Sequence, residues 1–247
     1  MSAPILVLFV IVGFLLGLLG GGGSILTIPL LLYGVGLEPK RAIATSLVVV
    51  SLGSLAAMLS HARAGKVVWR AGLSFAAAGT VGAYAGGRLA ASVPDAVLLW
   101  LFASMMVATS IGMLKERVAR EDTRNPAPSW QISLLGGIVG GFAGLVGAGG
   151  GFLVVPALTL LGGLPTKQAV GTSLLVTTLI SAAGFVGHAD HAALDFTLVS
   201  MMAALLALGS LLGSLLSQRV PEQALRKAFG VLVFVLAAFV IFEQLET

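Results

Sequence analysis

The sequence predicts an all-α integral membrane protein made of two tandem repeats. Three observations predict it: the composition, the long apolar stretches and an internal duplication. Of the 247 residues, 57% are hydrophobic and 10% are charged, and the mean hydropathy is +1.05. A soluble domain carries about 25% charged residues, so this chain has too few to cover a surface that faces water. The same composition excludes disorder, and the lack of cysteine excludes a disulfide scaffold.

Eight stretches free of Asp, Glu, Lys and Arg are predicted to form the membrane segments. Several approach the ~20 residues that cross ~30 Å of hydrocarbon. Lipid offers no water to the backbone, so each stretch must be helical or buried against other protein. None alternates as the strands of a membrane barrel do. The stretches run over residues 5–37, 42–60, 71–87, 96–114, 132–166, 168–187, 196–218 and 228–242.

The duplication appears when the sequence is shifted against itself by 127 positions. Residues 17–47 then align without a gap to residues 144–174, and 15 of the 31 pairs are identical. Matched Pro, Lys and Thr-Ser pairs in one register exceed what low complexity produces. The chain is therefore divided into a first membrane repeat (1–114), a charged linker (115–129) and a second membrane repeat (130–247).

The charge of the connections predicts how the repeats lie in the membrane. Eight plain crossings place 7 Lys and Arg on each side, which leaves no positive inside. If the first segment of each repeat enters the membrane and leaves it on the same side, the two sides carry 11 and 3 Lys and Arg residues. The two repeats are then inverted, each opening with a glycine-broken helix, as in many secondary transporters. A single long span broken at the glycines is the alternative.

Two glycine runs, at residues 20–24 and 147–152, carry the strongest functional signal. Each glycine costs a helix about 1 kcal/mol relative to Ala, and an unwound stretch leading into a helix offers N–H donors to an anion. We expect the two runs to meet near the midplane. Close helix packing is the alternative interpretation. The predicted substrate-binding residues are Gly22, Gly23, Ser24, Thr45, Ser46, Gly149, Gly150, Thr172 and Ser173.

The hydroxyl and histidine side chains have more than one interpretation. Thr45-Ser46 and Thr172-Ser173 can donate to an oxyanion without a permanent charge in lipid, or bond the carbonyl one turn back. His61 and His188 each end the second segment of a repeat. They are candidates for proton coupling, or simply interfacial side chains. No catalytic residue, metal site or cofactor is predicted.

The motifs resemble those of the TauE/SafE family of sulfite exporters and related permeases over essentially the whole chain. A glycine cluster is followed by A-x-x-T-S-L at Ala42–Leu47 and again at Ala169–Leu174, and H-x-x-x-G-K-V-x-W spans His61–Trp69. The second repeat departs from this pattern, since residues 188–196 lack the Gly-Lys pair. The resemblance implies a multi-pass carrier of the cytoplasmic membrane for small sulfur-containing anions such as sulfite or organosulfonates.

The predicted function is therefore a permease with alternating access to a midplane anion site, and no enzyme activity. The expected partners are a small anion, membrane lipid and a coupling H⁺ or Na⁺. A homo-oligomer remains open, and nucleic acid is excluded because the basic residues lie in short connections between apolar stretches. A passive anion channel and a non-transporting membrane scaffold are the alternative functions. An intramembrane hydrolase is less favoured because neither GxSxG nor HExxH occurs.

Overall fold

The computed structural model describes residues 3–114, 129–160, 162–188, 194–217 and 222–246, and these residues form helices and short connections without a strand. This confirms the predicted all-α class. Residues 115–128 of the predicted linker lie outside the described residues, and α6 begins at Ser129. The elements are α1 (Ala3–Leu19), η1 (Gly22–Leu26), α2 (Thr27–Pro29), η2 (Leu30–Gly34), α3 (Pro39–Arg63), α4 (Trp69–Ala90), α5 (Asp95–Leu114), α6 (Ser129–Val146), α7 (Gly151–Leu160), α8 (Thr166–His188), α9 (Phe196–Leu216) and α10 (Glu222–Glu246).

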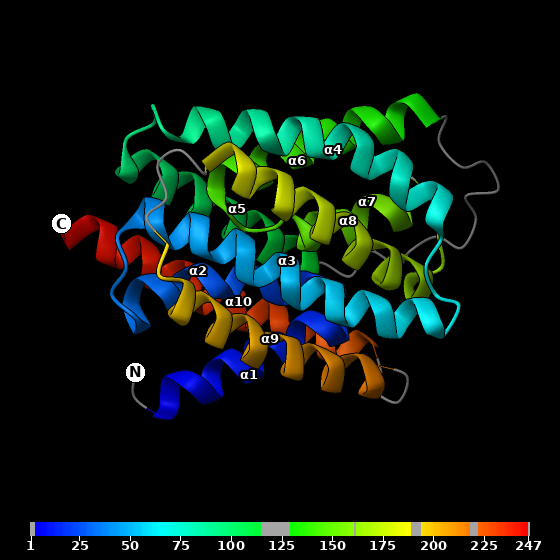
Figure 1. Ribbon diagram of the computed structural model, residues 1–247, viewed down its shortest axis with the longest axis horizontal. Helices are drawn as coiled ribbons and strands as arrows, with labels where there is room; N and C mark the ends of the chain where they lie inside the picture. Colours follow the sequence, from blue (N-terminus) through cyan, green and yellow to red (C-terminus); the bar gives the residue numbers. More distant parts are fainter. Residues whose placement is uncertain (1–2, 115–128, 161, 189–193, 218–221, 247) are drawn as a thin grey trace.

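Each half opens with a helix that breaks at its glycine run. α1 ends at Leu19, and the chain continues through η1, α2 and η2, whose turns change from 3₁₀ to α to π geometry. In Figure 1, α1 runs inward from the end of the molecule marked N, and the segment that follows runs back toward that same end. In the second half, α6 ends at Val146 and α7 starts at Gly151. The helices that follow are long, because their apolar stretches carry no such interruption.

The first helix of each half packs against a helix of the other half. A methyl group on Gly140 of α6 would run into the carbonyl oxygen of Gly79 on α4. The equivalent contact occurs in the other half, where a methyl group on Gly13 of α1 would run into the carbonyl oxygen of Leu206 on α9. Gly13 lies 127 positions before Gly140, and Leu206 lies 127 positions after Gly79. Small residues allow such close approach between membrane helices. The duplicated sequence thus makes the same interhelical contact twice.

α3 and α8 form the centre of the molecule and run antiparallel. Ser51 near the middle of α3 donates a hydrogen bond to the carbonyl of Thr178 near the middle of α8, at 3.0 Å. Leu47 lies beside Gly184, whereas His61 at the far end of α3 lies beside Gly171. Ser51 and Thr178 are themselves 127 positions apart, so this bond joins equivalent positions of the two halves. An inverted repeat predicts this antiparallel arrangement.

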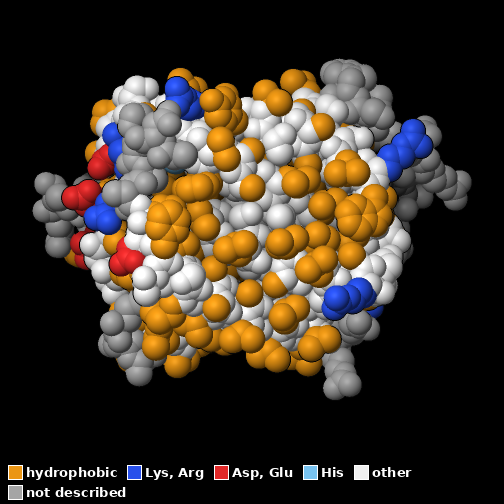
Figure 2. All heavy atoms as spheres, viewed as in Figure 1, with side chains coloured by type: hydrophobic (Ala, Val, Ile, Leu, Met, Phe, Trp, Pro, Cys, Tyr) orange, Lys and Arg blue, Asp and Glu red, His pale blue; other side chains and the backbone are white. Residues whose placement is uncertain are grey.

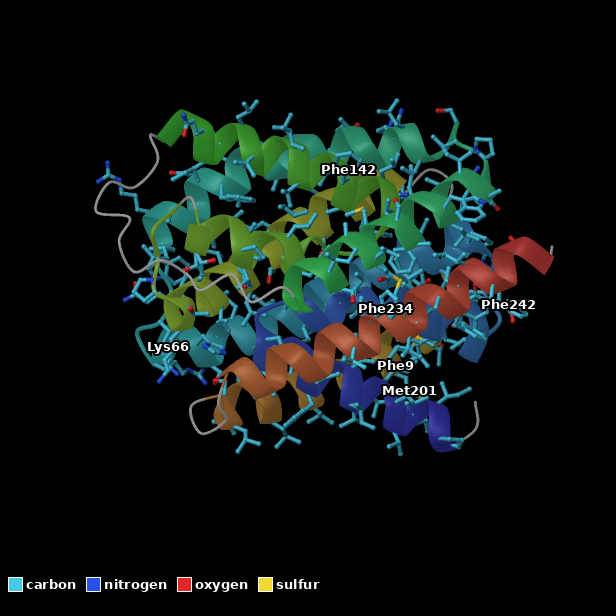
Figure 3. All side chains as sticks on the ribbon, turned by 180° about the vertical axis from the view of Figure 1, so that it is seen from behind. Phe9, Lys66, Phe142, Met201, Phe234 and Phe242 are labelled. Atoms are coloured by element: carbon cyan, nitrogen blue, oxygen red, sulfur yellow. The ribbon has the colours of Figure 1, made fainter. Side chains whose placement is uncertain are left out.

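The outer surface fits a membrane environment. In Figure 2, hydrophobic side chains cover the middle of the visible face, and charged side chains lie toward its two ends. Figure 3, from the opposite side, places Lys66 at one of these ends. By length and apolar composition, three of the described helices are able to cross a membrane: α3, α8 and α9. The fold is therefore that of an integral membrane protein.

Candidate functional site

The two glycine runs meet each other at the centre of the fold. A methyl group on Gly21 would lie 2.7 Å from the Cα atom of Gly151, and Thr177 Oγ1 would lie 3.1 Å from the same methyl group. Gly21 has φ +95°, and Gly149 and Gly150 have φ +65° and +68°. A side chain is disfavoured at these angles, so glycine is required both for the turn and for the contact. We call this region, residues 20–24 and 147–151, the glycine junction.

Serine hydroxyls hold the glycine junction from both sides. Ser46 of α3 donates to the carbonyl of Gly147 at 3.0 Å. Ser173 of α8 donates to the carbonyl of Gly20, and its Oγ also lies 2.8 Å from the carbonyl oxygen of Val170 on its own helix. The bonds to Gly147 and Gly20 are equivalent, because each partner in one bond lies 127 positions from its counterpart in the other. The breaks are thus bonded reciprocally across the two halves.

Ser24 adds a third hydroxyl between the runs. Its Oγ lies 2.7 Å from the carbonyl oxygens of both Gly21 and Ala148, so its single proton serves one of them at a time. Both Ser24 and Ser46 are fully buried. The structure therefore brings together the predicted residues Ser24, Ser46 and Ser173 and directs their hydroxyl groups at backbone carbonyls of the junction.

Two further hydroxyls at the junction were not predicted from the sequence. Thr177 and Ser181 are both 0% exposed, and neither hydroxyl has a hydrogen-bond partner among the described residues. A methyl group on Gly149 would lie 2.9 Å from Ser181 Oγ, and one on Gly151 would lie 2.6 Å from Thr177 Oγ1. A buried donor without a partner costs about 1–3 kcal/mol. An unpaired buried group therefore needs an explanation, such as a catalytic role or a bound ion.

The sequence did contain a signal for these residues. Ser173, Thr177 and Ser181 follow one another at spacings of four, which places them on one face of α8. The repeat alignment hid Thr177 because its counterpart in α3 is Val50. Ser181 does have a hydroxyl counterpart, Ser54, which is also fully buried and also lacks a partner among the described residues.

The backbone of the second glycine run offers N–H donors. Within the described part of the chain, the amides of Ala148, Gly149 and Gly150 have no backbone carbonyl partner. They lead directly into the first turn of α7, where the helix dipole is positive and the first amides also lack intrahelical acceptors. Amides without a backbone acceptor at the start of a helix, with buried hydroxyls beside Gly149, are groups of the kind that bind a small anion.

Two of the predicted glycines face inward on their own hairpins. A methyl group on Gly23 would run into the backbone of α1 at Leu16, and one on Gly150 would lie 2.9 Å from Ala143 Cβ of α6. These positions allow each short segment to fold back on the helix before it. Gly22 begins η1, and Gly149 faces the hydroxyls of α8.

The threonines of the two Thr-Ser pairs differ from their serine neighbours. Thr172 accepts a hydrogen bond of 2.9 Å from the backbone N–H of Val68, in the connection between α3 and α4. It therefore anchors that connection instead of facing the junction. Thr45 is buried beside Ser46 on α3.

The two predicted proton-coupling histidines lie at the far ends of their helices. Nε2 of His61 lies 3.3 Å from the carbonyl oxygen of Gly17 on α1. Nδ1 of His188 lies 2.9 Å from the carbonyl oxygen of Gly184 on its own helix. Because α3 and α8 run antiparallel, the structure does not bring the two histidines together. Their different partners show that they are not equivalent.

No group of three or more His, Cys, Asp or Glu side chains in the described ranges is placed to hold a metal ion. The acidic residues that the structure describes include Asp95, which pairs with Lys40 at 3.6 Å in an exposed contact. The polar groups at the glycine junction are all uncharged. The site described here is thus built from backbone and hydroxyl groups.

Broken helices that meet inside an all-helical apolar bundle are a feature of many membrane transporters. Comparison with known proteins then gives the family. The chain belongs to the sulfite exporter TauE/SafE family, whose sequence model matches residues 5–240. It is a membrane transporter family, as the names of the relatives indicate.

Several curated relatives are described as probable membrane transporter proteins. One from Xylella fastidiosa is 37% identical over 241 residues, which cover 95% of this chain and 92% of the relative. One from Methanocaldococcus jannaschii is 33% identical over 199 residues, covering 74% of this chain and 72% of the relative. The protein YdhB of Bacillus subtilis is 26% identical over 91% of this chain and 93% of its own length. No solved structure matches the chain.

Proposed function

We propose that this protein carries small sulfur-containing anions, such as sulfite or organosulfonates, across the cell membrane, and that the anion binds at the glycine junction. The observation that carries the proposal is the pair of fully buried hydroxyls, Thr177 and Ser181, which lack a partner among the described residues and lie beside Gly149. The family description, sulfite exporter, supports the choice of anion.

The chemistry of the junction favours an anion that is bound only transiently. Hydroxyl and amide N–H groups donate hydrogen bonds to an oxyanion, yet they place no fixed charge in lipid, where a charged side chain is costly. Such donors also leave no strong ion pair to be broken when the anion departs. An anion at the junction would give Thr177 and Ser181 the acceptor they lack.

Alternating access is supported by the antiparallel relation of α3 and α8. Ser46 and Ser173 make equivalent bonds to opposite glycine runs. In an inverted repeat, exchange of the conformations of the two halves closes one side of the site and opens the other. We propose that loss of one serine contact opens the junction toward one side while the equivalent contact keeps the other side closed.

The test is a matched pair of substitutions on α8. Thr177→Val keeps the shape of the side chain and removes the unpartnered hydroxyl. Thr178→Val makes the same change one position along, where the hydroxyl instead donates to the carbonyl of Leu174 at 2.8 Å. In proteoliposomes, sulfite or sulfonate flux should fall at least tenfold in Thr177→Val, because a hydrogen bond to a charged group contributes about 1.5–3 kcal/mol.

Thermal unfolding separates function from folding in this pair. Thr177→Val should unfold at the same temperature as the wild type or higher, because it removes a buried hydroxyl that lacks a partner in the described residues. Thr178→Val should keep its flux. Unchanged flux in Thr177→Val would contradict the proposed site. A flux that no ion gradient drives uphill would instead identify a passive channel.

A further inference from the structure

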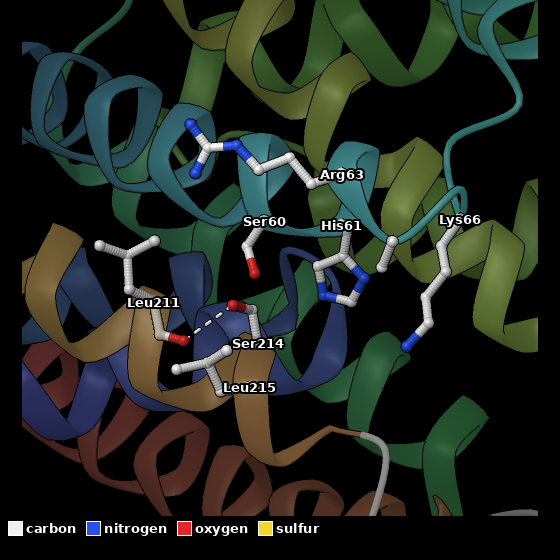
Figure 4. Close-up of a pocket in the computed structure, with 8 residues that line it drawn as sticks. Ser60, His61, Arg63, Lys66, Leu211, Ser214 and Leu215 are labelled. Carbon is white, nitrogen blue, oxygen red and sulfur yellow. Dashed lines mark hydrogen bonds between the residues drawn. The ribbon is translucent and has the colours of Figure 1, made fainter.

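A second polar site lies at the end of α3, away from the glycine junction. It is a cavity of about 490 Å³ lined by side chains from α3, the α3–α4 connection and α9. Figure 4 shows Ser60, His61 and Ser214 close together, with Lys66 extending beside His61 and Arg63 extending the other way along α3. The lining residues are Ser60, His61, Arg63, Ala64, Lys66, Leu211, Ser214 and Leu215.

The described lining of this cavity carries positive charge. Among the described residues that line it, Arg63 and Lys66 are charged and none is acidic. Burial, and next the positive charge of Lys167 at the start of α8, lower the pKa of Lys66. An anion in the cavity would offset both the repulsion and the lost hydration. The cavity therefore favours a small anion.

His61 forms the buried wall of the cavity and is 3% exposed. Its Nε2 faces the carbonyl of Gly17 at 3.3 Å. A carbonyl only accepts hydrogen bonds, so Nε2 must carry the proton and the neutral ring leaves a lone pair on Nδ1. Nδ1 is buried and has no partner among the described residues.

A proton on Nδ1 would place a positive charge in the wall of this cavity, where a bound anion would stabilise it. Protonation of Nδ1 also keeps the Nε2–H bond to Gly17. Lys66 in the connection is the charged group that acts on the ring, whereas Lys167 on α8 acts on Lys66 and Arg63 on α3 extends away from the ring. α9 contributes Leu211, Ser214 and Leu215, which do not titrate. Lys66 repels an imidazolium at this position, and an anion in the cavity would offset that repulsion.

We propose that this cavity is a docking site for a small oxyanion, in which the anion and a proton on Nδ1 of His61 bind together. Lys66 supplies the attraction, and Ser60 and Ser214 supply hydroxyl groups. The further step, that the docked anion is the one carried to the glycine junction, rests on the proposed function. It would make His61 the residue that couples proton and anion movement.

The experiment measures sulfate binding, because sulfate does not itself titrate between about pH 6 and pH 8, where histidine does. Calorimetry of the full-length protein in phosphatidylcholine nanodiscs, in buffers of different ionisation heat, reports affinity and proton uptake together. Affinity should rise as pH falls, by up to about tenfold per pH unit for one coupled proton. His61→Gln should abolish both the pH dependence and the proton uptake, while the Gln amide can still donate to Gly17.

A matched pair of charge substitutions tests the cavity itself. Lys66→Gln should weaken sulfate binding about tenfold at every pH, because it removes a charged donor. Arg70→Gln removes the same charge from the same end of the bundle, but Arg70 is exposed and does not line the cavity, so its affinity should match the wild type. Equal affinity in the two variants, or wild-type binding that is independent of pH, would overturn the proposal.

Two further comparisons assign the anion. A lipid headgroup presents the same phosphate chemistry, so nanodiscs that contain phosphatidylglycerol form a second arm. Unchanged sulfate affinity there supports a free anion, whereas competition by the lipid overturns the docking role. Thr177→Val should bind sulfate at this cavity as the wild type does while losing flux. Failure of flux loss would refute the glycine junction alone, and failure of pH-linked binding would refute the cavity alone.

Discussion

The hydroxyl of Ser46 donates a hydrogen bond of 3.0 Å to the carbonyl of Gly147, in the opposite half of the chain. Ser173 makes the equivalent bond to Gly20. A glycine break exposes a carbonyl that would otherwise belong to a helix, and lipid offers no donor for it. Each half thus supplies the donor that the other half needs. This reciprocity gives the first prediction.

Ser46→Ala and Ser173→Ala should destabilise the protein by similar amounts. Each removes one donor and leaves one buried carbonyl without it, at a cost of about 1 kcal/mol. Reversible unfolding in mixed micelles measures the loss. Ser92→Ala is the control, because Ser92 is exposed and its hydroxyl bonds to the carbonyl of Leu89, within its own turn. A loss confined to one of the two buried serines would contradict the reciprocal arrangement.

Gly21→Ala should be far more damaging than Gly36→Ala. Both glycines have a positive φ, so both variants incur about 1 kcal/mol of backbone strain. A methyl group on Gly36 meets nothing within 4 Å, whereas one on Gly21 lies 2.7 Å from the Cα of Gly151. The difference between their unfolding free energies therefore isolates the contact between the two glycine runs. Equal losses would mean that the runs do not touch.

Neighbouring glycines on α6 give a test of its packing against α4. A methyl group on Gly140 would run into the carbonyl of Gly79, but one on Gly141 would lie 3.8 Å from the nearest such oxygen, that of Gly82. Gly140→Ala should therefore cost about 1–3 kcal/mol by overpacking. Gly141→Ala should be neutral or slightly stabilising, since Ala favours a helix. The reverse order in a thermal unfolding series would reject this interface.

The inverted arrangement predicts that equivalent connections lie on opposite faces of the membrane. The chain has no cysteine, so single cysteines can be introduced without a background. Glu38→Cys precedes α3 and Lys167→Cys lies at the start of α8, and both positions are exposed. An impermeant maleimide added to intact cells should label the first and not the second. Labelling of both would exclude inverted repeats.

The sequence predicted the helical membrane fold and the contact between the two glycine runs. It did not predict the hydroxyls of Thr177 and Ser181, which lie beside the second run. Gly20, Gly147 and the Thr-Ser pairs stand out because duplication preserves them in one register. Thr177 does not, since Val50 takes its place in the other half. In the structure, Thr177 Oγ1 lies close to Gly151, because glycine has no side chain there. In the repeat alignment, Gly151 is the counterpart of Ser24. The first run thus carries its own hydroxyl, on Ser24, whereas the second run has the hydroxyl of Thr177 from α8 beside it. Only the packed structure shows this difference.

The sequence by itself determined the environment and the plan: too few charges for water, stretches long enough for lipid, and two copies of one glycine-interrupted unit. These properties depend on composition and periodicity, which need no knowledge of distant contacts. The tertiary structure alone decided which hydroxyl groups form hydrogen bonds within the protein and which lack a partner among the described residues. Ser46, Ser173 and Thr172 bond to atoms about one hundred or more positions away, while Thr177 and Ser181 lack a partner among the described residues. Hydrogen bonding depends on distance in space, and no pattern along the chain reports that distance.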